Sequence, residues 1–342
     1  MPATQQNQTG VQQEETMHKL ITAAALAALA ATGVTATGAT AKEFRSSDVH
    51  PMDYPTVQAV VHMGKLINER TTGKHSVKVF GQSVLGSEKD TIEQTKIGAL
   101  DMVRVNISAF NNIVPETNVP ALPFVFKSKA HMRKVLDGAV GDDILKALEA
   151  QGFIGLAFYD SGSRSFYTTK KQIKTVDDMK GMKIRVQQSD MWVAMMQALG
   201  ANATPLPYAE VYTALKTGVV DGAENNWPSY ESSRHYEVAQ TYSITEHSMA
   251  PELLVFSKRV WDGLPVNERD IIRQAAKDSV PVMRKLWDDR EAAAEKTVTA
   301  GGAKILTDVD KKAFATAMQP VYAKFAADAK LQDLVKRIQA ID

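Results

Sequence analysis

Between residues 166 and 224 the sequence alternates short strand patterns with short helical patterns, and this alternation limits the fold more than any other feature. Strand patterns lie at 166–169, 183–186, 203–205 and 220–224, and helical patterns lie between them at 176–179, 189–199 and 209–217. Strands that alternate with helices favour an α/β fold with largely parallel sheets. With 342 residues, 44% of them hydrophobic, and no internal repeat, the chain has enough material for two such lobes.

The rest of the chain indicates how two lobes would be connected. We expect the chain to cross between lobes near Asp160 and near Met249, which would make a hinge over a central cleft. A long helix is predicted from about Asn267 to Ala300. The predicted domains are 42–160 plus 250–290 for the first lobe and 161–249 plus 300–342 for the second.

Helix starts can be predicted where a capping residue precedes an apolar period. A first strand ends near His50, and Asp53 can then cap a helix whose apolar face includes Val57 and Ile67. Ser87 to Asp90 resembles a capping box at the start of a second helix. Ser189 is predicted to cap the helix that follows the strand at 183–186.

Residues 1–41 are predicted to be a leader and a signal peptide. Residues 1–16 are polar, so Met17 is the better start, and a short basic head then precedes an apolar run from Leu20 to Ala31. Small residues follow and end with Ala39-Thr40-Ala41, which completes the pattern of a secretory signal. A membrane anchor is the alternative, but the run is too short to span ~30 Å of hydrocarbon. We therefore expect a soluble mature protein in the periplasm.

Composition excludes several classes of function. The absence of cysteine excludes thiol catalysis, cysteine-ligated zinc and iron–sulfur clusters. A net charge of +1 gives no field that would recruit nucleic acid. No hydrolase elbow, metalloprotease, dinucleotide or P-loop motif is present, and the seven histidines show no metal-ligand spacing. We expect no metal, no cofactor and no enzymatic activity.

Arg185 is the strongest candidate for a binding residue. In the strand Lys183–Val186 alternate side chains share a face, so Ile184 and Val186 can line the core while Arg185 points the other way. The turn that follows places Arg185 at the carboxyl end of the strand, where open α/β sheets bind ligands. Its planar guanidinium matches a carboxylate. The alternative is a structural ion pair with an acidic residue of the other lobe.

Two further segments carry candidate ligand residues. Arg164 lies in a Gly/Ser turn directly after the strand Gly152–Tyr159, and its alternative is a solvated loop arginine. After the strand at 220–224, Asn225 and Asn226 offer donors and acceptors, and Trp227 offers a ring for an aliphatic or sugar face. The alternative for these three residues is an ordinary turn with the tryptophan in the packing.

Four more polar residues fall at strand ends or helix starts on the same side, and each has a structural alternative when taken singly. For Glu88 this alternative is favourable placement at a helix N-terminus, and for His50 it is a capped turn before Pro51. The four are His50, Glu88, Arg104 and Asn106. Glu88 and Glu224 form the one carboxylate pair that could suggest a carbohydrate-processing enzyme.

Three motifs carry a family resemblance. They are Met179–Val186 with its KIRV sequence, Ala198–Pro205, and Glu210–Asn225 with its DGAEN sequence. In these motifs, and over essentially the whole mature chain, the sequence resembles the DctP-like extracytoplasmic solute receptors of TRAP transporters. The resemblance implies a two-lobed solute-binding fold with a long helix that spans both lobes. It also implies that the protein passes its solute to a separate TRAP membrane permease, without a cofactor.

The resemblance also implies roles for individual residues. Arg185 would pair with the carboxylate of the solute, Arg164 and Asn225 would assist, and Glu88 would help to set specificity. The start at Asp48 and the run Asn225–Trp227 are similar to those of members that bind sugar acids. We therefore expect a monomeric receptor for a small organic acid, with a hexuronate such as glucuronate or galacturonate as ligand. A receptor for a C4-dicarboxylate or a 2-oxo acid is the alternative, and a sensor protein could be a further partner.

Overall fold

A computed structural model describes residues 41–342 of the chain. The predicted leader and signal peptide lies outside the described residues, apart from Ala41. Among the helices that are described, none has both the length and the apolar character needed to cross a bilayer.

The described chain is a mixture of strands and helices, as the alternating pattern predicts. The strands are β1 (Lys42–Ser47), β2 (His75–Phe80), β3 (Met102–Asn106), β4 (Phe153–Tyr159), β5 (Arg164–Thr168), β6 (Lys183–Val186), β7 (Asn202–Pro205), β8 (Gly222–Asn225), β9 (Thr241–Ser248), β10 (Glu252–Ser257) and β11 (Lys304–Leu306). The helices are α2 (Pro55–Arg70), α3 (Glu88–Lys96), α4 (Asn118–Ala121), α5 (Lys129–Leu136), α6 (Ala139–Ala147), α7 (Asp190–Ala198), α8 (Val211–Thr217), α9 (Trp227–Ser232), α10 (Lys258–Trp261), α11 (Val266–Ala300), α12 (Lys311–Ala317), α13 (Gln319–Phe325) and α14 (Ala329–Gln339).

The strands form two sheets, which confirms the predicted α/β class. One sheet has the order β2-β1-β3-β10-β4, and the other has the order β11-β9-β5-β8-β6-β7. The prediction of largely parallel sheets is wrong, because both sheets are mixed. In the first sheet β10 is antiparallel to β3 and to β4, and in the second β5 is antiparallel to β8 and to β9. The antiparallel strands β5 and β10 are those that directly follow the two crossings, and each runs against both of its neighbours.

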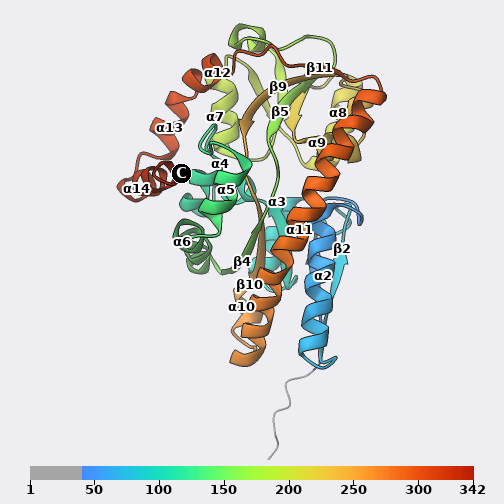
Figure 1. Cartoon of the computed structure of the whole chain (residues 1–342), viewed down its shortest axis with the longest axis vertical. Coiled ribbons are helices and arrows are strands. Elements are labelled where there is room, and N and C mark those ends of the chain that lie inside the picture. Colours follow the sequence, from blue (N-terminus) through green and yellow to red (C-terminus); the bar gives the residue numbers. More distant parts are fainter. Residues whose placement is uncertain (1–40) are drawn as a thin grey trace, which may run out of the picture. The chain divides into compact units, whose positions relative to one another are not determined.

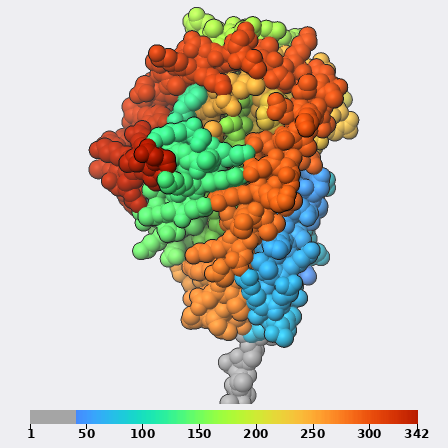
Figure 2. All heavy atoms as spheres, in the orientation of Figure 1, coloured from blue at the N-terminus to red at the C-terminus, as the bar shows by residue number. Residues whose placement is uncertain are grey.

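Two chain crossings and one long helix join the parts that carry the sheets. The first crossing follows β4 at Asp160 and the second follows β9 at Met249, as predicted. The predicted long helix is α11, which packs against α2 and β4 beside the first sheet and against α9 beside the second (Figure 1). One side of α11 lies on the surface of the described chain, next to α2 (Figure 2).

The helix starts follow the local signals at Ser87 but not at Asp53. The side chain of Ser87 accepts a hydrogen bond from the backbone N–H of Asp90, and the Asp90 carboxylate accepts one in return from the backbone of Ser87. The predicted cap at Asp53 is wrong. Helix α2 starts one residue later than a cap at that position would place it, with Tyr54 at the cap and Pro55 in the first turn. Proline at this position sets the helical φ angle and has no N–H to satisfy.

The C-terminal helices contact both parts of the chain. Helix α12 packs against β9 and α13 packs against α7, whereas α14 packs against α4 and α6. Apolar side chains of these helices join one core cluster with residues next to both sheets. The boundaries of the two lobes, including the assignment of 300–342 to the second, therefore stay a prediction.

Candidate ligand-binding site

Seven of the nine predicted ligand residues line one cavity, which we call the inner cavity. It has about 300 Å³ of space not filled by atoms, its mouth included. The carboxyl ends of β3, β6 and β8 reach it, as expected for a ligand site of open α/β sheets. Its lining consists of Val49, His50, Glu88, Arg104, Asn106, Arg164, Arg185, Gln187, Tyr208, Asn225, Ser229 and Glu252.

Arg185 is held in place by backbone and not by a carboxylate. Its Nε and Nη2 donate to the carbonyl oxygen of Leu206 at 3.0 and 2.7 Å. Ile184 and Val186 are fully buried in the core, so the predicted alternation along β6 is correct. The side chain of Arg185 is buried, and this burial lowers the pKa of its guanidinium. Among the described residues it forms no ion pair, so its charge is available to a ligand.

Arg164 and Arg104, in contrast, are already neutralised. Arg164 binds Glu224 through two nitrogens, with Nε–Oε2 and Nη2–Oε1 distances of 2.6 and 2.8 Å. Burial opposes the charge of this arginine, but Glu224 outweighs it and the pKa of Arg164 rises. Arg104 donates to both oxygens of Asp48 and also pairs with Glu252. Both arginines can still donate hydrogen bonds at the cavity wall, but neither offers an uncompensated positive charge.

The three predicted residues from Asn225 to Trp227 have different positions in the structure. Asn225 lines the inner cavity and lies at the end of β8; its side-chain oxygen accepts a hydrogen bond from the N–H of Asn226 at 2.9 Å. The side chain of Asn226 caps α9 by accepting from the backbone of Ser229 at 2.8 Å. Trp227 stacks on Tyr242 with ring centres 3.9 Å apart. Neither Asn226 nor Trp227 lines the inner cavity.

His50, Glu88 and Asn106 place polar atoms around the cavity. The ring of His50 stacks on Tyr54 at 3.8 Å, and its buried Nδ1 has no hydrogen-bond partner among the described residues. Burial, with Arg104 and Arg164 nearby, holds the pKa of His50 well below its usual value, so the ring is neutral. The Glu88 carboxylate accepts from the backbone N–H of Asn106 at 2.8 Å, and burial raises its pKa.

Five lining residues were not predicted from the sequence. Gln187 follows β6 directly, so its position beside Arg185 could have suggested it. Tyr208 lies 22 residues after Val186 and donates to the carbonyl of Ser229 at 3.3 Å. No local pattern marks Tyr208 or Ser229, because non-local packing brings both residues to the cavity. The other two missed residues are Val49 and Glu252.

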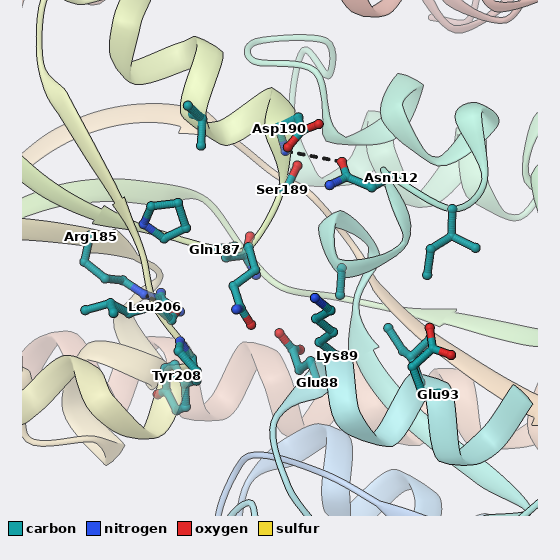
Figure 3. Close-up of a pocket in the computed structure, with 17 residues that line it drawn as sticks. Glu88, Lys89, Glu93, Asn112, Arg185, Gln187, Ser189, Asp190, Leu206 and Tyr208 are labelled. Atoms are coloured by element: carbon teal, nitrogen blue, oxygen red, sulfur yellow. Dashed lines mark hydrogen bonds between the residues drawn. The ribbon is translucent and has the colours of Figure 1, made fainter.

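A second and larger space, which we call the outer cavity, adjoins the inner one. It has about 1040 Å³ of space not filled by atoms, its mouth included. Glu88, Arg185, Gln187 and Tyr208 line both cavities. Figure 3 shows this space between α3 on one side and the segments that follow β6 and β7 on the other. A hydrogen bond of 3.3 Å from the backbone of Asp190 to the side chain of Asn112 closes one end of it.

The groups of the inner cavity are suited to holding a ligand by charge and hydrogen bonds. Within residues 41–342, no group of three or more potential ligands is arranged to hold a metal ion. Glu224, one of the two carboxylates considered for a glycosidase, is fully engaged with Arg164. Among residues 41–342, the cavity offers one guanidinium without an acidic partner, that of Arg185, and a surrounding set of hydrogen-bonding groups.

Most of the described chain matches a known protein family. The model of the DctP family, described as bacterial extracellular solute-binding protein, family 7, matches residues 46–328. The chain belongs to this family. The resemblance seen in the sequence motifs is thereby confirmed, and members of the DctP family are extracytoplasmic receptors for solutes, not enzymes.

Individual DctP-family proteins are similar over most of their length. A solute-binding protein of Chromohalobacter salexigens is 42% identical over 324 residues, which is 94% of this chain and 96% of the relative. A TRAP periplasmic solute-binding protein from Bradyrhizobium sp. BTAi1, solved in complex with α/β-D-galacturonate, is 63% identical. That match covers 87% of this chain and 99% of the other, with a TM-score of 0.86. A TRAP periplasmic solute-binding protein from Roseobacter denitrificans with bound β-D-glucuronate is 40% identical, with a TM-score of 0.86. That match covers 88% of this chain and 100% of the other.

Proposed function

We propose that this chain is a periplasmic receptor that binds a hexuronate, with galacturonate as its preferred ligand, and delivers it as a monomer to a TRAP-type permease. The observation that carries the proposal is Arg185, a buried guanidinium in a polar cavity that has no acidic partner within the described chain. A ligand carboxylate is the group that compensates such a charge best, because the guanidinium offers two parallel donors.

The number of uncompensated charges favours one carboxylate over two. Three arginines reach the inner cavity, but Arg104 and Arg164 are paired with carboxylates of the protein. A dicarboxylate held within the inner cavity would place its second negative charge near Glu88 and Glu252, where no second unpaired cation of the described residues lines the wall. A desolvated charge without a partner is strongly unfavourable. A monocarboxylate fits the charge distribution better.

The remaining groups of the cavity suit a ligand with many hydroxyls. Glu88 is an acceptor, the amide nitrogen of Asn225 is a donor, and neutral His50 can act as either. The buried oxygen of Gln187 is an acceptor without a partner in the described chain. A sugar acid can pair these groups through its hydroxyls. An aliphatic 2-oxo acid would leave most of them unpaired, which carries a desolvation penalty.

The ligands of related proteins support the same choice. The Bradyrhizobium relative, 63% identical, was solved with galacturonate, and the Roseobacter relative with bound glucuronate is 40% identical. These two sugar acids differ in the configuration at one ring carbon. We place galacturonate first because its receptor is the more similar of the two, and glucuronate second.

A thermal-shift screen of the purified mature chain tests the proposal. The panel is galacturonate, glucuronate, succinate and a 2-oxo acid, each at the same concentration. A ligand at 100 times its Kd should stabilise the protein by about 2.7 kcal/mol. We expect the shift with galacturonate and a smaller or equal one with glucuronate. A shift with succinate and none with the uronates would refute the proposed ligand, and turnover of a uronide would refute a pure receptor.

A further inference from the structure

The side chains around the inner cavity cover Arg185 so closely that a ligand cannot reach it unless part of the wall moves. Arg185 is 3% exposed and His50 is 5% exposed. A ligand must pass the side chains that cover the guanidinium, so contacts across the wall must open to admit a hexuronate and then form again around it. A contact that forms again in this way also helps to retain the bound ligand.

On one side of the inner cavity, the wall is built from two segments that come from different sheets. One is the segment after β1 that contains His50 and Tyr54, and the other is α9, which follows β8 and contains Ser229. Helices α2 and α9, to which these residues lead, both pack against α11 (Figure 1). Tyr54 belongs to one apolar core cluster and Tyr230 of α9 belongs to another. In the described chain, these two segments are therefore not held together by a shared apolar core.

Tyr54 links the two segments, although it lines neither the inner nor the outer cavity. Its hydroxyl lies 2.8 Å from Oγ of Ser229 and 3.5 Å from Oδ1 of Asn226. Its ring stacks on His50 with centres 3.8 Å apart, and it meets Trp287 of α11 edge-on at 5.9 Å. Burial holds the pKa of Tyr54 well above its usual value, so the hydroxyl keeps its proton. Tyr54 thus contacts one residue of the cavity wall on each side, His50 and Ser229.

Tyr208 completes a ring of four residues in this part of the wall. Its hydroxyl donates to the carbonyl oxygen of Ser229 at 3.3 Å, and its aromatic ring meets His50 edge-on with centres 4.9 Å apart. His50, Tyr208 and Ser229 line the inner cavity, and Tyr54 lies behind them. The ring joins the two segments through the Tyr54–Ser229 hydrogen bond and the His50–Tyr208 contact. The first of these connections depends on a single oxygen atom of Tyr54.

Resting on the proposed function, we propose that Tyr54 is a positioning residue for the bound hexuronate, and that its hydroxyl holds the His50 side of the wall against α9 and so slows release of the ligand. Tyr54 acts through His50 and Ser229 and does not contact the ligand itself. A hydrogen bond that forms as the wall closes stabilises the closed complex and has no part in the first encounter. Its loss should therefore raise the dissociation rate constant and leave the association rate constant nearly unchanged.

Rapid-mixing kinetics of the mature chain with galacturonate test this inference. Tyr54→Phe removes the hydroxyl and keeps the ring that stacks on His50. We expect the dissociation rate constant and the Kd to rise about 2- to 12-fold, and the association rate constant to change by less than about twofold. Tyr159→Phe is the matched control, because the hydroxyl of Tyr159 in β4 also bonds a serine, Ser279 of α11, at 2.6 Å, but this bond does not reach a segment of the second sheet. The control should keep both rate constants within about twofold of the wild type.

A double-mutant cycle shows whether Tyr54 acts through Ser229. Because Ser229 lines the inner cavity, Ser229→Ala can change the affinity by itself. In the Ser229→Ala background the hydrogen bond is already absent, so Tyr54→Phe should raise the dissociation rate constant by less than about twofold. Urea unfolding of each ligand-free variant measures its folding separately from these kinetics.

The outcomes distinguish this inference from the proposed function. If galacturonate binds and Tyr54→Phe releases it at the wild-type rate, Tyr54 has no positioning role and the receptor proposal stands. The inference is also overturned if Tyr159→Phe speeds release as much as Tyr54→Phe does, or if Ser229→Ala leaves the effect of Tyr54→Phe undiminished. If the wild type binds neither galacturonate nor glucuronate, the proposed function itself has failed.

Discussion

Replacing Arg185 by alanine should separate binding from folding more cleanly than any other change in the cavity. The guanidinium is buried, its hydrogen bonds go to the carbonyl of Leu206, and no carboxylate of the described chain forms an ion pair with it. Its removal would leave a ligand carboxylate desolvated and unpaired. Truncating one partner of such a pair costs about 2–5 kcal/mol, which is about 30- to 4,000-fold in Kd.

The same geometry predicts that the ligand-free protein keeps its stability. A buried guanidinium without an acidic partner is a desolvated charge, and burial lowers its pKa for this reason. Arg185→Ala should therefore unfold at the same urea concentration as the wild type or at a higher one. Arg185→Lys should recover only part of the lost affinity, because an ammonium cannot present the two parallel donors of a guanidinium.

Calorimetric titration with galacturonate, combined with urea unfolding of the ligand-free variants, measures both effects. The reasoning would be refuted by an alanine variant that folds normally and binds galacturonate with the affinity of the wild type. A large loss of ligand-free stability would contradict it in another way, since it would mean that Arg185 is a structural residue.

Three further predictions concern the surroundings of the site. Arg164→Ala should lower the free energy of unfolding by about 3–5 kcal/mol, because it removes the guanidinium that neutralises the buried carboxylate of Glu224; an unchanged urea midpoint would contradict the ion pair. Trp227→Phe should change the Kd for galacturonate by less than about twofold, since the ring stacks on Tyr242 outside the cavity; a tenfold loss in titration would show that it contacts the ligand. His235 has its pKa lowered by burial to about 3, whereas the unfolded chain titrates near the ordinary value of 6.5. Acidification from pH 7 to pH 5 therefore protonates His235 in the unfolded state alone and removes about 2 kcal/mol of stability. Over the same pH range the His235→Gln variant should lose about 2 kcal/mol less than the wild type in urea titrations. The same loss of stability in variant and wild type would contradict this reasoning.

The parts of the fold that could be predicted are those that short-range patterns determine. The capping box at Ser87 and the alternation along Lys183–Val186 are complete within a few residues, and both are correct. The cap at Asp53 was predicted wrongly because Pro55 decides where that helix begins. The antiparallel strands within each sheet could not be predicted, since they depend on where the chain re-enters a sheet after a crossing.

The same distinction applies to the site. Arg185 was identified because its own strand places it at the cavity. The partner of Arg164 was not, since Glu224 is 60 residues away and is brought close by the pairing of β5 with β8. Tyr208 carries no local signal either. Asn226 was predicted as a ligand residue on its chemistry alone, but the helix that starts at Trp227 uses its side chain as a cap.

A crystal structure of the mature chain with galacturonate would test the central claim most directly. We predict that the carboxylate lies within hydrogen-bond distance of the Arg185 guanidinium, with the ring hydroxyls on Glu88, Asn225 and Gln187. A galacturonate whose carboxylate is bound elsewhere, with Arg185 still bonded to Leu206 alone, would contradict the account.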